Sequence, residues 1–455
     1  MTTLKSINPA TEELFAEFKE IDLSSTEEVI EESSYSQRKW VAVDISKRTE
    51  IISKISDFVR NNKEVFAEII TNEMGKPISE SIAEVEKCAW LCDYYVENGS
   101  RFLAEQSISS DADKSFVSFE PLGVILGVMP WNFPFWQVFR FAVPAIIAGN
   151  SVLVKHAPNV QASAVAIEKI FHDCGIPKDL FRILMIDVDI IPNIISNKHV
   201  KAVSLTGSEL AGSKVAECSG KNLKKTVLEL GGSDAFIVLS DADLPKCIDS
   251  AVKGRMLNNG QSCIAAKRFI VHEDVYDEFI AGLQKTIESL IVGDPMLSET
   301  QVGPLAREDI LNKIENQVKE SIKLGAELVS GGKRVGESGY YYAPTILTNI
   351  SQSMPVYNQE TFGPVFSVFK FNDIDKMVEL ANDTDFGLGG SVWSKNKDKA
   401  LSVARRIETG AVFINDFTKS DPRLPFGGVK NSGYGRELSE FGIKEFVNVK
   451  TIAVF

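Results

Sequence analysis

Histidine is rare in this sequence, and the cysteine patterns that bind metal ions are missing. The four histidines stand at positions 156, 172, 199 and 272, outside residues 255–268, the stretch that contains Cys263. There is no CxxC and no HExxH, so we predict no metal site. Without a histidine in that stretch, a cysteine–histidine dyad of the protease type is disfavoured.

Long apolar runs and excess positive charge are also missing. No stretch of about twenty apolar residues occurs, and residues 1–14 have no apolar core, so neither a membrane span nor a secretory signal is predicted. The formal net charge of -13 argues against nucleic acid or an anionic membrane as a general partner. The six cysteines are scattered, at positions 88, 92, 174, 218, 247 and 263, which is typical of reduced thiols. We therefore predict a cytoplasmic protein.

The order of apolar patterns predicts the fold class. With 455 residues the chain has room for about three domains, or for two with an appendage. Residues 1–24 favour short strands with a turn at Asn8-Pro9, and residues 25–99 favour helices. Strands and helices then alternate, over 115–129, 134–149, 151–155, 160–173, 181–186, 201–206, 207–218 and 226–230. This alternation is typical of a doubly wound parallel sheet, which binds nucleotides at the carboxyl ends of its strands.

A second alternation follows Gly231-Gly232. Its elements are expected at 235–239, 243–257, 267–272 and 275–290, which favours a second α/β domain. The last residues, VNVKTIAVF, predict an edge strand with no obvious partner, so we expect it to add to a sheet of a neighbouring subunit.

Cys263 lies in RMLNNGQSCIAAKR, residues 255–268, between Gly260 and the small residues Ala265 and Ala266. Small neighbours let a reacting carbon and a flat cofactor approach the thiol. The cysteine is therefore a candidate nucleophile, with an inert buried thiol as the alternative.

Two glutamates stand beside glycines at the ends of apolar segments. Burial of Glu229, in LELGG, would raise its pKa toward the range of a general base, although it could instead accept hydrogen bonds from the Gly231-Gly232 turn. Glu360, in QETFGPV, has the chemistry to bind two vicinal ribose hydroxyls, or it is a solvated loop residue.

A strand-to-helix turn, Gly207-Ser208-x-x-x-Gly212, is a candidate pyrophosphate site, although turns of this kind also occur without a ligand. It is not GxGxxG, so the standard Rossmann fingerprint is absent. Lys155 ends an earlier strand and has no acid just after it, which favours NADP over NAD unless this lysine is simply solvated.

Together these stretches resemble the aldehyde dehydrogenase superfamily over essentially the whole chain. The motifs are PWNFP (130–134), SLTGSELAG (204–212), LELGG (228–232), GQSC (260–263), QETFGPV (359–365) and PFGGVKNSGYGRE (425–437). The resemblance implies an α/β fold with a Rossmann-type NAD(P)-binding domain (1–102 and 122–230), a catalytic domain (231–430) and a small β oligomerisation unit (103–121 and 431–455). It also implies a homo-oligomer, either a dimer or a tetramer.

The resemblance also implies a role for each site residue. Cys263 would attack the aldehyde, Asn132 and the Cys263 N–H would hold the oxyanion, and Glu229 would activate water to release the acid. NADP, or alternatively NAD, would accept the hydride. The residues implied in cofactor binding are Trp131, Lys155, Gly207, Ser208, Gly212, Gly231, Glu360 and Phe362.

Four positions correspond to the substrate pocket of the family: Phe133, Arg140, Leu257 and Phe426. Arg140 replaces an aromatic residue, and its guanidinium suits a carboxylate or polyhydroxyl substrate unless it pairs with an acid of the protein. The chain resembles succinate-semialdehyde dehydrogenases at Arg140. Those enzymes usually add a second arginine where this chain has Leu257, so glyceraldehyde and lactaldehyde fit nearly as well. Phe141 stands where many members have a lysine in the proton path.

Two other functions are consistent with the motifs. A coenzyme-A acylating oxidoreductase would lack a glutamate at position 229, so Glu229 argues against it. A catalytically silent structural homologue would tend to have lost the nucleophile, and Cys263 is present.

Overall fold

The computed structural model describes residues 3–455, so the first two residues of the expected strand region 1–24 and of the expected domain 1–102 lie outside it. The chain begins with an antiparallel hairpin, β1 (Thr3–Ile7) and β2 (Leu14–Lys19). The side chain of Asn8 accepts a hydrogen bond from the Ala10 N–H at 2.9 Å, which forms the predicted turn at Asn8-Pro9.

The first large sheet has six strands in the order β19-β9-β8-β5-β6-β7. They are β5 (Val124–Met129), β6 (Ser151–His156), β7 (Phe181–Ile183), β8 (Val200–Thr206), β9 (Lys225–Glu229) and β19 (Gly433–Tyr434). β19 is antiparallel to β9, and the other neighbours are parallel. Alternate residues face opposite sides, since Ile125 packs in one apolar cluster and Val124 and Leu126 in another. The predicted parallel sheet is confirmed.

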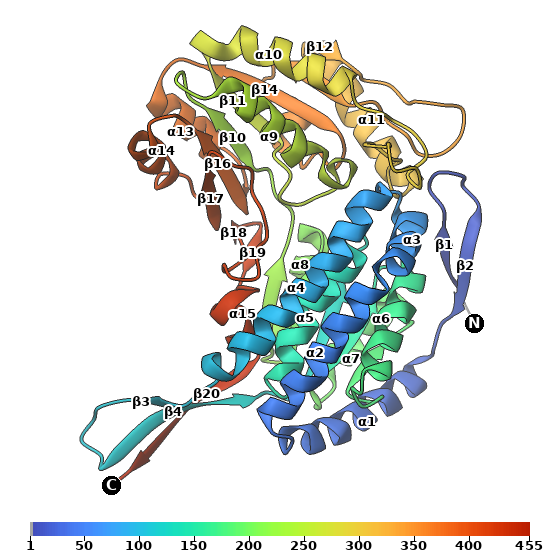
Figure 1. Ribbon diagram of the computed structural model, residues 1–455, viewed down its shortest axis with the longest axis vertical. Coiled ribbons are helices and arrows are strands. Elements are labelled where there is room, and N and C mark those ends of the chain that lie inside the picture. The colour runs from blue at the N-terminus through green and yellow to red at the C-terminus, as the bar shows by residue number, and fades with distance from the viewer. Residues whose placement is uncertain (1–2) are drawn as a thin grey trace.

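Helices cover both faces of this sheet (Figure 1). The helices that pack against its strands are α1 (Leu23–Val41), α5 (Pro134–Ile147), α6 (Gln161–Asp173), α7 (Ile191–Ser196) and α8 (Glu209–Lys221). A further layer packs on α5 and α6 and consists of α2 (Ile45–Asn61), α3 (Lys63–Met74) and α4 (Ile78–Phe102). None of the helices within residues 3–455 combines the length and the apolar character needed to cross a membrane.

The second large sheet has seven strands in the order β12-β13-β14-β11-β10-β16-β17, and only the β12–β13 pair is antiparallel. They are β10 (Ala235–Val238), β11 (Arg268–His272), β12 (Glu327–Ser330), β13 (Thr345–Thr348), β14 (Val365–Phe371), β16 (Gly389–Trp393) and β17 (Ala411–Ile414). The helices of this part are α9 (Leu244–Met256), α10 (Glu273–Glu288), α11 (Glu308–Lys323), α12 (Pro355–Asn358), α13 (Ile374–Asn382) and α14 (Lys397–Ala404). A short antiparallel pair joins β15 (Phe386–Gly387), which precedes β16, with β18 (Val429–Lys430), which precedes β19.

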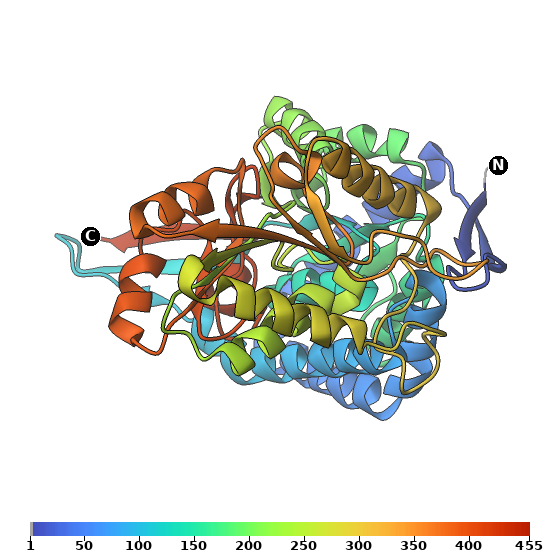
Figure 2. The ribbon, with the colours of Figure 1, turned by 90° about the horizontal axis from the view of Figure 1, so that it is seen from above.

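The C-terminal strand does have a partner within its own chain. β20 (Val447–Val454) pairs antiparallel with β4 (Lys114–Pro121), and β3 (Gln106–Ser107) lies on the other side of β4. This sheet projects from the body as an arm, and β1 lies on the opposite side of the molecule from it (Figures 1 and 2). The segment 431–455 is not confined to the arm, because β19 joins the first sheet and α15 (Ser439–Lys444) packs against α4 and α5.

Candidate active site

The loop that carries Cys263 has an unusual backbone. Asn258, Asn259 and Gly260 are all left-handed, with φ of 58°, 55° and 78°. Such strain persists only where surrounding contacts fix it, and it is common at functional sites. A Cβ on Gly260 would lie 2.4 Å from the Gly363 carbonyl oxygen, so the loop packs tightly against a second segment. The position of Cys263 is therefore closely determined.

Asn132 is bonded to this loop. The side-chain amide of Asn132 donates a hydrogen bond to the backbone carbonyl of Gln261 at 3.1 Å. The backbone carbonyl of Asn132 accepts a hydrogen bond from the side-chain amide of Asn258 at 2.6 Å. α5 begins two residues later, and Glu84 of α4 accepts hydrogen bonds from the N–H groups of Phe135 and Trp136, both at 2.9 Å. Since an amide has two N–H donors, one remains for another acceptor.

Cys263 lies where two cavities meet. One, of about 160 Å³, contains all four residues expected to bind substrate, and we call it the acyl cavity. The other, of about 260 Å³, extends along the carboxyl ends of the first sheet, and we call it the cofactor cavity. Both include Cys263 in their lining. The thiol is thus accessible from two sides.

The cofactor cavity contains most of the residues expected there. Its lining includes Trp131, Asn132, Gly207, Ser208, Gly231, Glu360 and Phe362. The Ser208 hydroxyl accepts from the Ala211 N–H at 3.3 Å and begins α8, as the predicted strand-to-helix turn requires. Lys155 and Gly212 are not in the lining: Lys155 is buried at the end of β6, and a Cβ on Gly212 would lie 2.6 Å from the Leu230 side chain.

The carboxylate of Glu360 has one oxygen fixed and one directed to the cavity side. Oε1 accepts from the Gly232 N–H at 3.0 Å and lies 3.2 Å from the Lys267 ammonium. Oε2 faces Gly231, where a Cβ would come within 2.9 Å of it. Lys267 also donates to the carbonyls of Ser262 and Cys263, at 2.9 and 2.6 Å. One buried lysine therefore joins Glu360 to the cysteine loop.

Burial raises the pKa of the Cys263 thiol to about 12, while the positive charges of Lys267 and Arg140 oppose this shift. Desolvation disfavours the thiolate, so the uncharged thiol is the dominant form in this structure at neutral pH. Groups that stabilise the thiolate therefore increase the reactivity of Cys263.

Glu229 lies at the end of β9 and lines neither cavity. Its carboxylate is buried, and neither oxygen has a hydrogen-bond partner within residues 3–455. Oε1 lies against Gly427, where a Cβ would be 2.7 Å away. Burial, followed by the nearby Glu437 carboxylate, raises the pKa of Glu229 well above its usual range. The structure thus gives Glu229 the predicted raised pKa but places its carboxylate against Gly427, outside the lining of both cavities.

Arg140 lines the acyl cavity, and its charge is paired. Its guanidinium forms a buried ion pair with Glu437, and it stacks on the Phe426 ring at 4.6 Å from the centroid. The sequence alone is consistent with either a substrate anion or a protein carboxylate as the partner of this arginine. In the structure the partner is the carboxylate of Glu437, and Arg140 itself borders the acyl cavity.

Comparisons with known proteins identify the family of the chain. The model of the aldehyde dehydrogenase family matches residues 1–452. The chain belongs to the aldehyde dehydrogenase family. A probable NADP-dependent succinate-semialdehyde dehydrogenase of Synechocystis sp. (strain PCC 6803) is 47% identical over 99% of both chains. The solved structure of Gox0499 is 41% identical, covers both chains completely and has a TM-score of 0.99.

A third relative was solved with a cofactor. Succinic semialdehyde dehydrogenase from Streptococcus pyogenes, in complex with NADP+, is 39% identical over 99% of both chains, with a TM-score of 0.97. These matches confirm the predicted family, the α/β fold and the enzymatic class: the chain is an NAD(P)-dependent aldehyde dehydrogenase.

Four charged residues of the site in this aldehyde dehydrogenase were not predicted from the sequence. Glu437 and Lys267 neutralise Arg140 and Glu360, and Arg307 lies 5.7 Å from the Trp131 ring centroid in the cofactor cavity. Lys87, from α4, lines the acyl cavity. Lys267 stands four residues after Cys263 and Glu437 ends the motif 425–437, so both could have been found from the sequence, whereas Lys87 and Arg307 stand far from every motif.

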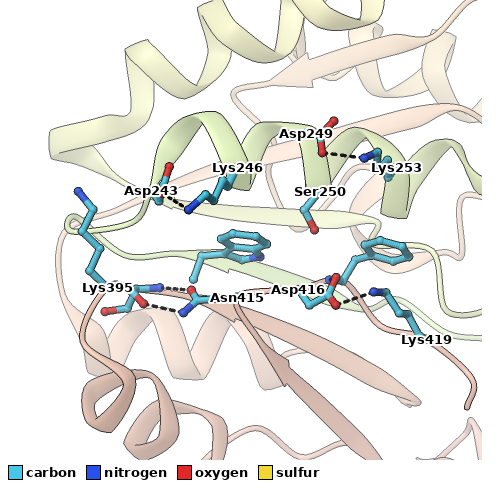
Figure 3. A pocket seen from close by; sticks show the side chains of 12 residues that line it. Asp243, Lys246, Asp249, Ser250, Lys253, Lys395, Asn415, Asp416 and Lys419 are labelled. Carbon is cyan, nitrogen blue, oxygen red and sulfur yellow. Dashed lines mark hydrogen bonds and ion pairs between the residues drawn. The ribbon is translucent and has the colours of Figure 1, made fainter.

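A surface groove of about 600 Å³ adjoins the acyl cavity, and Phe417 and Lys419 line both. Lysines and aspartates alternate along it, in the pairs Asp243–Lys246, Asp249–Lys253 and Asp416–Lys419 (Figure 3). Because these charges are mutually neutralised, the groove offers a polar approach to the cavity with little net charge.

Proposed function

We propose that this enzyme oxidises succinate semialdehyde to succinate with NADP as the oxidant. The observation that carries the proposal is the position of Cys263, which borders both the acyl cavity and the cofactor cavity. An aldehyde carbon bound at this thiol lies between the two spaces, as hydride transfer requires.

The chain's own residues account for each step. The Cys263 thiolate attacks the aldehyde and forms a thiohemiacetal, whose oxyanion accepts hydrogen bonds from the Asn132 amide and the Cys263 N–H. Bound NADP supplies the hydride acceptor, and loss of hydride leaves a thioester on Cys263. Glu229 then takes a proton from the water that hydrolyses the thioester. Its side chain has to turn from Gly427 toward Cys263 to do so.

The residues of the cofactor cavity fit a dinucleotide. In the proposal, Glu360 holds the nicotinamide ribose through Oε2, and Trp131 and Phe362, which pack edge to face at 5.7 Å, line the cleft. The start of α8, at Gly207 and Ser208, would hold the pyrophosphate. Lys155, Gly212 and Gly231 remain cofactor residues by resemblance to the family. The NADP-dependent relatives support NADP over NAD.

The proposed substrate follows from the side chains that line the acyl cavity, which combine aromatic walls with positively charged groups. Phe133, Phe426 and Leu257 supply apolar walls, and Arg140 supplies positive charge. The similarity to succinate-semialdehyde dehydrogenases favours succinate semialdehyde, an aldehyde that also carries a carboxylate. Glyceraldehyde and lactaldehyde are the alternatives, since Leu257 replaces the usual second arginine.

A substrate panel tests the proposal. We expect kcat/KM for succinate semialdehyde with NADP to exceed that for D-glyceraldehyde, lactaldehyde and hexanal by at least about tenfold, because one charge-assisted hydrogen bond contributes about 1.5–3 kcal/mol. Initial rates of NADPH and NADH formation measure it. Acid formed without coenzyme A excludes the acylating alternative, and absence of turnover with every aldehyde would favour the silent homologue.

Arg140→Leu is expected to destabilise the protein as well as to impair binding. Its loss leaves Glu437 buried beside Glu229 without a counter-ion, and breaking a buried pair costs about 3–5 kcal/mol in free energy of unfolding. Urea denaturation measures this loss. KM for succinate semialdehyde should also rise more than KM for hexanal.

The double variant Arg140→Leu/Glu437→Leu is the matched control for the expected loss of stability. It removes both charges and should recover most of the stability, because apolar replacement of a whole buried pair is often neutral. If the single variant is as stable as the wild type, the ion pair does not have the role described. Equal changes in KM for semialdehyde and hexanal would count against an anchoring role of Arg140.

The assembly and compartment follow from the same family. We propose a homodimer or homotetramer in which the arm formed by β3, β4 and β20 contributes to the interface, since Val449 and Val454 of β20 are exposed. The cytoplasm remains the predicted compartment.

A further inference from the structure

Lys87 brings an ammonium group to the wall of the acyl cavity. It lies in the middle of α4, and its Nζ donates to the Ser420 hydroxyl at 2.6 Å and lies 4.3 Å from the centre of the Trp136 ring. All three residues line the cavity that also contains Cys263. The group is therefore part of the space that receives the acyl chain of the substrate.

Lys87 differs from the other cations of this cavity in having no carboxylate partner. Within residues 3–455, no acidic oxygen lies within 4.0 Å of its Nζ, whereas Arg140 is paired with Glu437 and Lys419 with Asp416 at 2.5 Å. The neutral Ser420 hydroxyl is the one hydrogen-bond partner of Lys87 in this part of the chain. A partly desolvated cation without a counter-ion is costly unless an anion joins it.

The acids that face Lys87 are already engaged elsewhere. Glu84 binds the Lys76 ammonium and the first N–H groups of α5. Asp421 is paired with Arg423 at 2.6 Å. Burial, with the repulsion of Arg140 next, lowers the pKa of Lys87 to about 8, against the weaker opposing effects of Cys88, Glu84 and Asp421. Glu80 also lines the cavity, where burial raises the pKa of its carboxyl to about 7, and it accepts a hydrogen bond from the Asn258 N–H at 2.7 Å. Lys87 thus has no acid of the described residues as a direct partner.

We propose that Lys87, together with the Ser420 hydroxyl, binds the distal carboxylate of the semialdehyde while Cys263 binds its aldehyde carbon. The inference rests on the proposed function and deepens it. Lys87 supplies from α4 the second cation that Leu257 does not provide. The substrate class is therefore a short aldehyde with a carboxylate at the opposite end.

Comparison of Lys87→Met with Lys419→Met tests the proposal. Methionine keeps the length of the side chain and removes the charge, and Lys419 is a lysine of the same cavity wall whose charge is already paired. We expect Lys87→Met to raise the ratio of KM for succinate semialdehyde to KM for butanal by about 10- to 100-fold, because a hydrogen bond to a charged group is lost. Lys419→Met should change that ratio by less than about threefold, as is usual for an exposed ion pair. Lys87→Arg, which keeps the charge, should recover a large part of the effect.

Direct binding gives a readout that is independent of turnover. The dissociation constant of succinate for the NADP-bound enzyme, measured by calorimetry, should rise by a similar factor in Lys87→Met and stay near the wild-type value in Lys419→Met. Butanal oxidation by Lys87→Met shows in the same samples that the variant is folded.

The pH dependence provides a further test. Lys87 is charged below its pKa and neutral above it, so kcat/KM for the semialdehyde relative to butanal should fall as the pH rises through about 8. Titration of Cys263 affects both substrates and cancels in the ratio. Glu80, whose pKa burial raises to about 7, lines the same cavity and affects the wild type and Lys87→Met alike. The fall near pH 8 should therefore be absent in Lys87→Met.

Failure of the inference is distinguishable from failure of the proposed function. If the wild type does not prefer succinate semialdehyde to butanal, the proposed function is wrong. If the wild type has that preference and Lys87→Met keeps it to the same degree as Lys419→Met, the role of Lys87 is overturned and Arg140 alone binds the carboxylate.

Discussion

Replacement of Cys263 by alanine should abolish NADPH formation with every aldehyde. No other thiol borders the acyl cavity, among the residues that the structure describes, so no thiohemiacetal can form. Loss of a covalent nucleophile costs on the order of 10⁶-fold in kcat in well-studied hydrolases. We expect a similarly large loss here, measured as the initial rate of absorbance increase at saturating semialdehyde and NADP.

Cys174→Ala is the matched control for this variant. Cys174 is also partly exposed, and burial raises the pKa of its thiol to about 11, but it bonds to the Lys54 carbonyl at 3.7 Å far from both cavities. It should keep wild-type activity. Cofactor binding by Cys263→Ala, followed through the fluorescence of Trp131, shows that the site is intact. An active Cys263→Ala enzyme would rule out the proposed chemistry.

Replacement of Glu229 by glutamine should separate the two halves of the reaction. Thiohemiacetal formation and oxidation need no base at position 229, so one equivalent of NADPH per active site should appear rapidly. Hydrolysis of the thioester then lacks its base, and the steady-state rate should fall by about 10²- to 10⁴-fold. Stopped-flow absorbance measures the burst and the slow phase in one experiment.

The pH dependence of the hydrolytic rate is a second test of Glu229 as a general base. The raised pKa of Glu229, caused by burial and by Glu437, means that its carboxylate accepts a proton only above that pKa. The hydrolytic rate of the wild type should therefore increase with pH, and this increase should be absent in Glu229→Gln. Glu360→Gln is the comparison variant, because loss of a ribose-binding carboxylate should raise KM for NADP without producing a burst. A Glu229→Gln enzyme with a normal steady-state rate would contradict the role of this residue.

Much of the fold was predictable because it depends on local periodicity. Parallel strands buried on both faces read as apolar runs, such as those of β6 and β8, and the intervening helices repeat their apolar residues every three to four positions. Ser208 could be placed at the start of α8 because its hydroxyl satisfies an N–H group of the first helical turn. The pairing of the C-terminal strand could not be predicted, since nothing within its sequence identifies β4 as its partner.

The motif residues of the site were predictable for a related reason. Five of the predicted residues follow the ends of strands or form short loops. The structure places all of them in the cavity that also contains Cys263: Asn132, Ser208, Gly231, Glu360 and Phe362. Lys155 and Gly212 follow the same pattern, but their side-chain positions face the packed interior.

The sequence by itself determined the family, the alternating α/β architecture and the candidate nucleophile, because each depends on residues that are neighbours along the chain. Only the tertiary structure decided which charges neutralise each other: Glu437 with Arg140, Lys267 with Glu360, and no acid with Lys87 among residues 3–455. It also decided that Glu229 rests against Gly427. Backbone hydrogen bonding fixes local structure over a few residues, whereas the partner of a buried charge depends on how distant helices and strands pack, and periodicity carries no record of that packing.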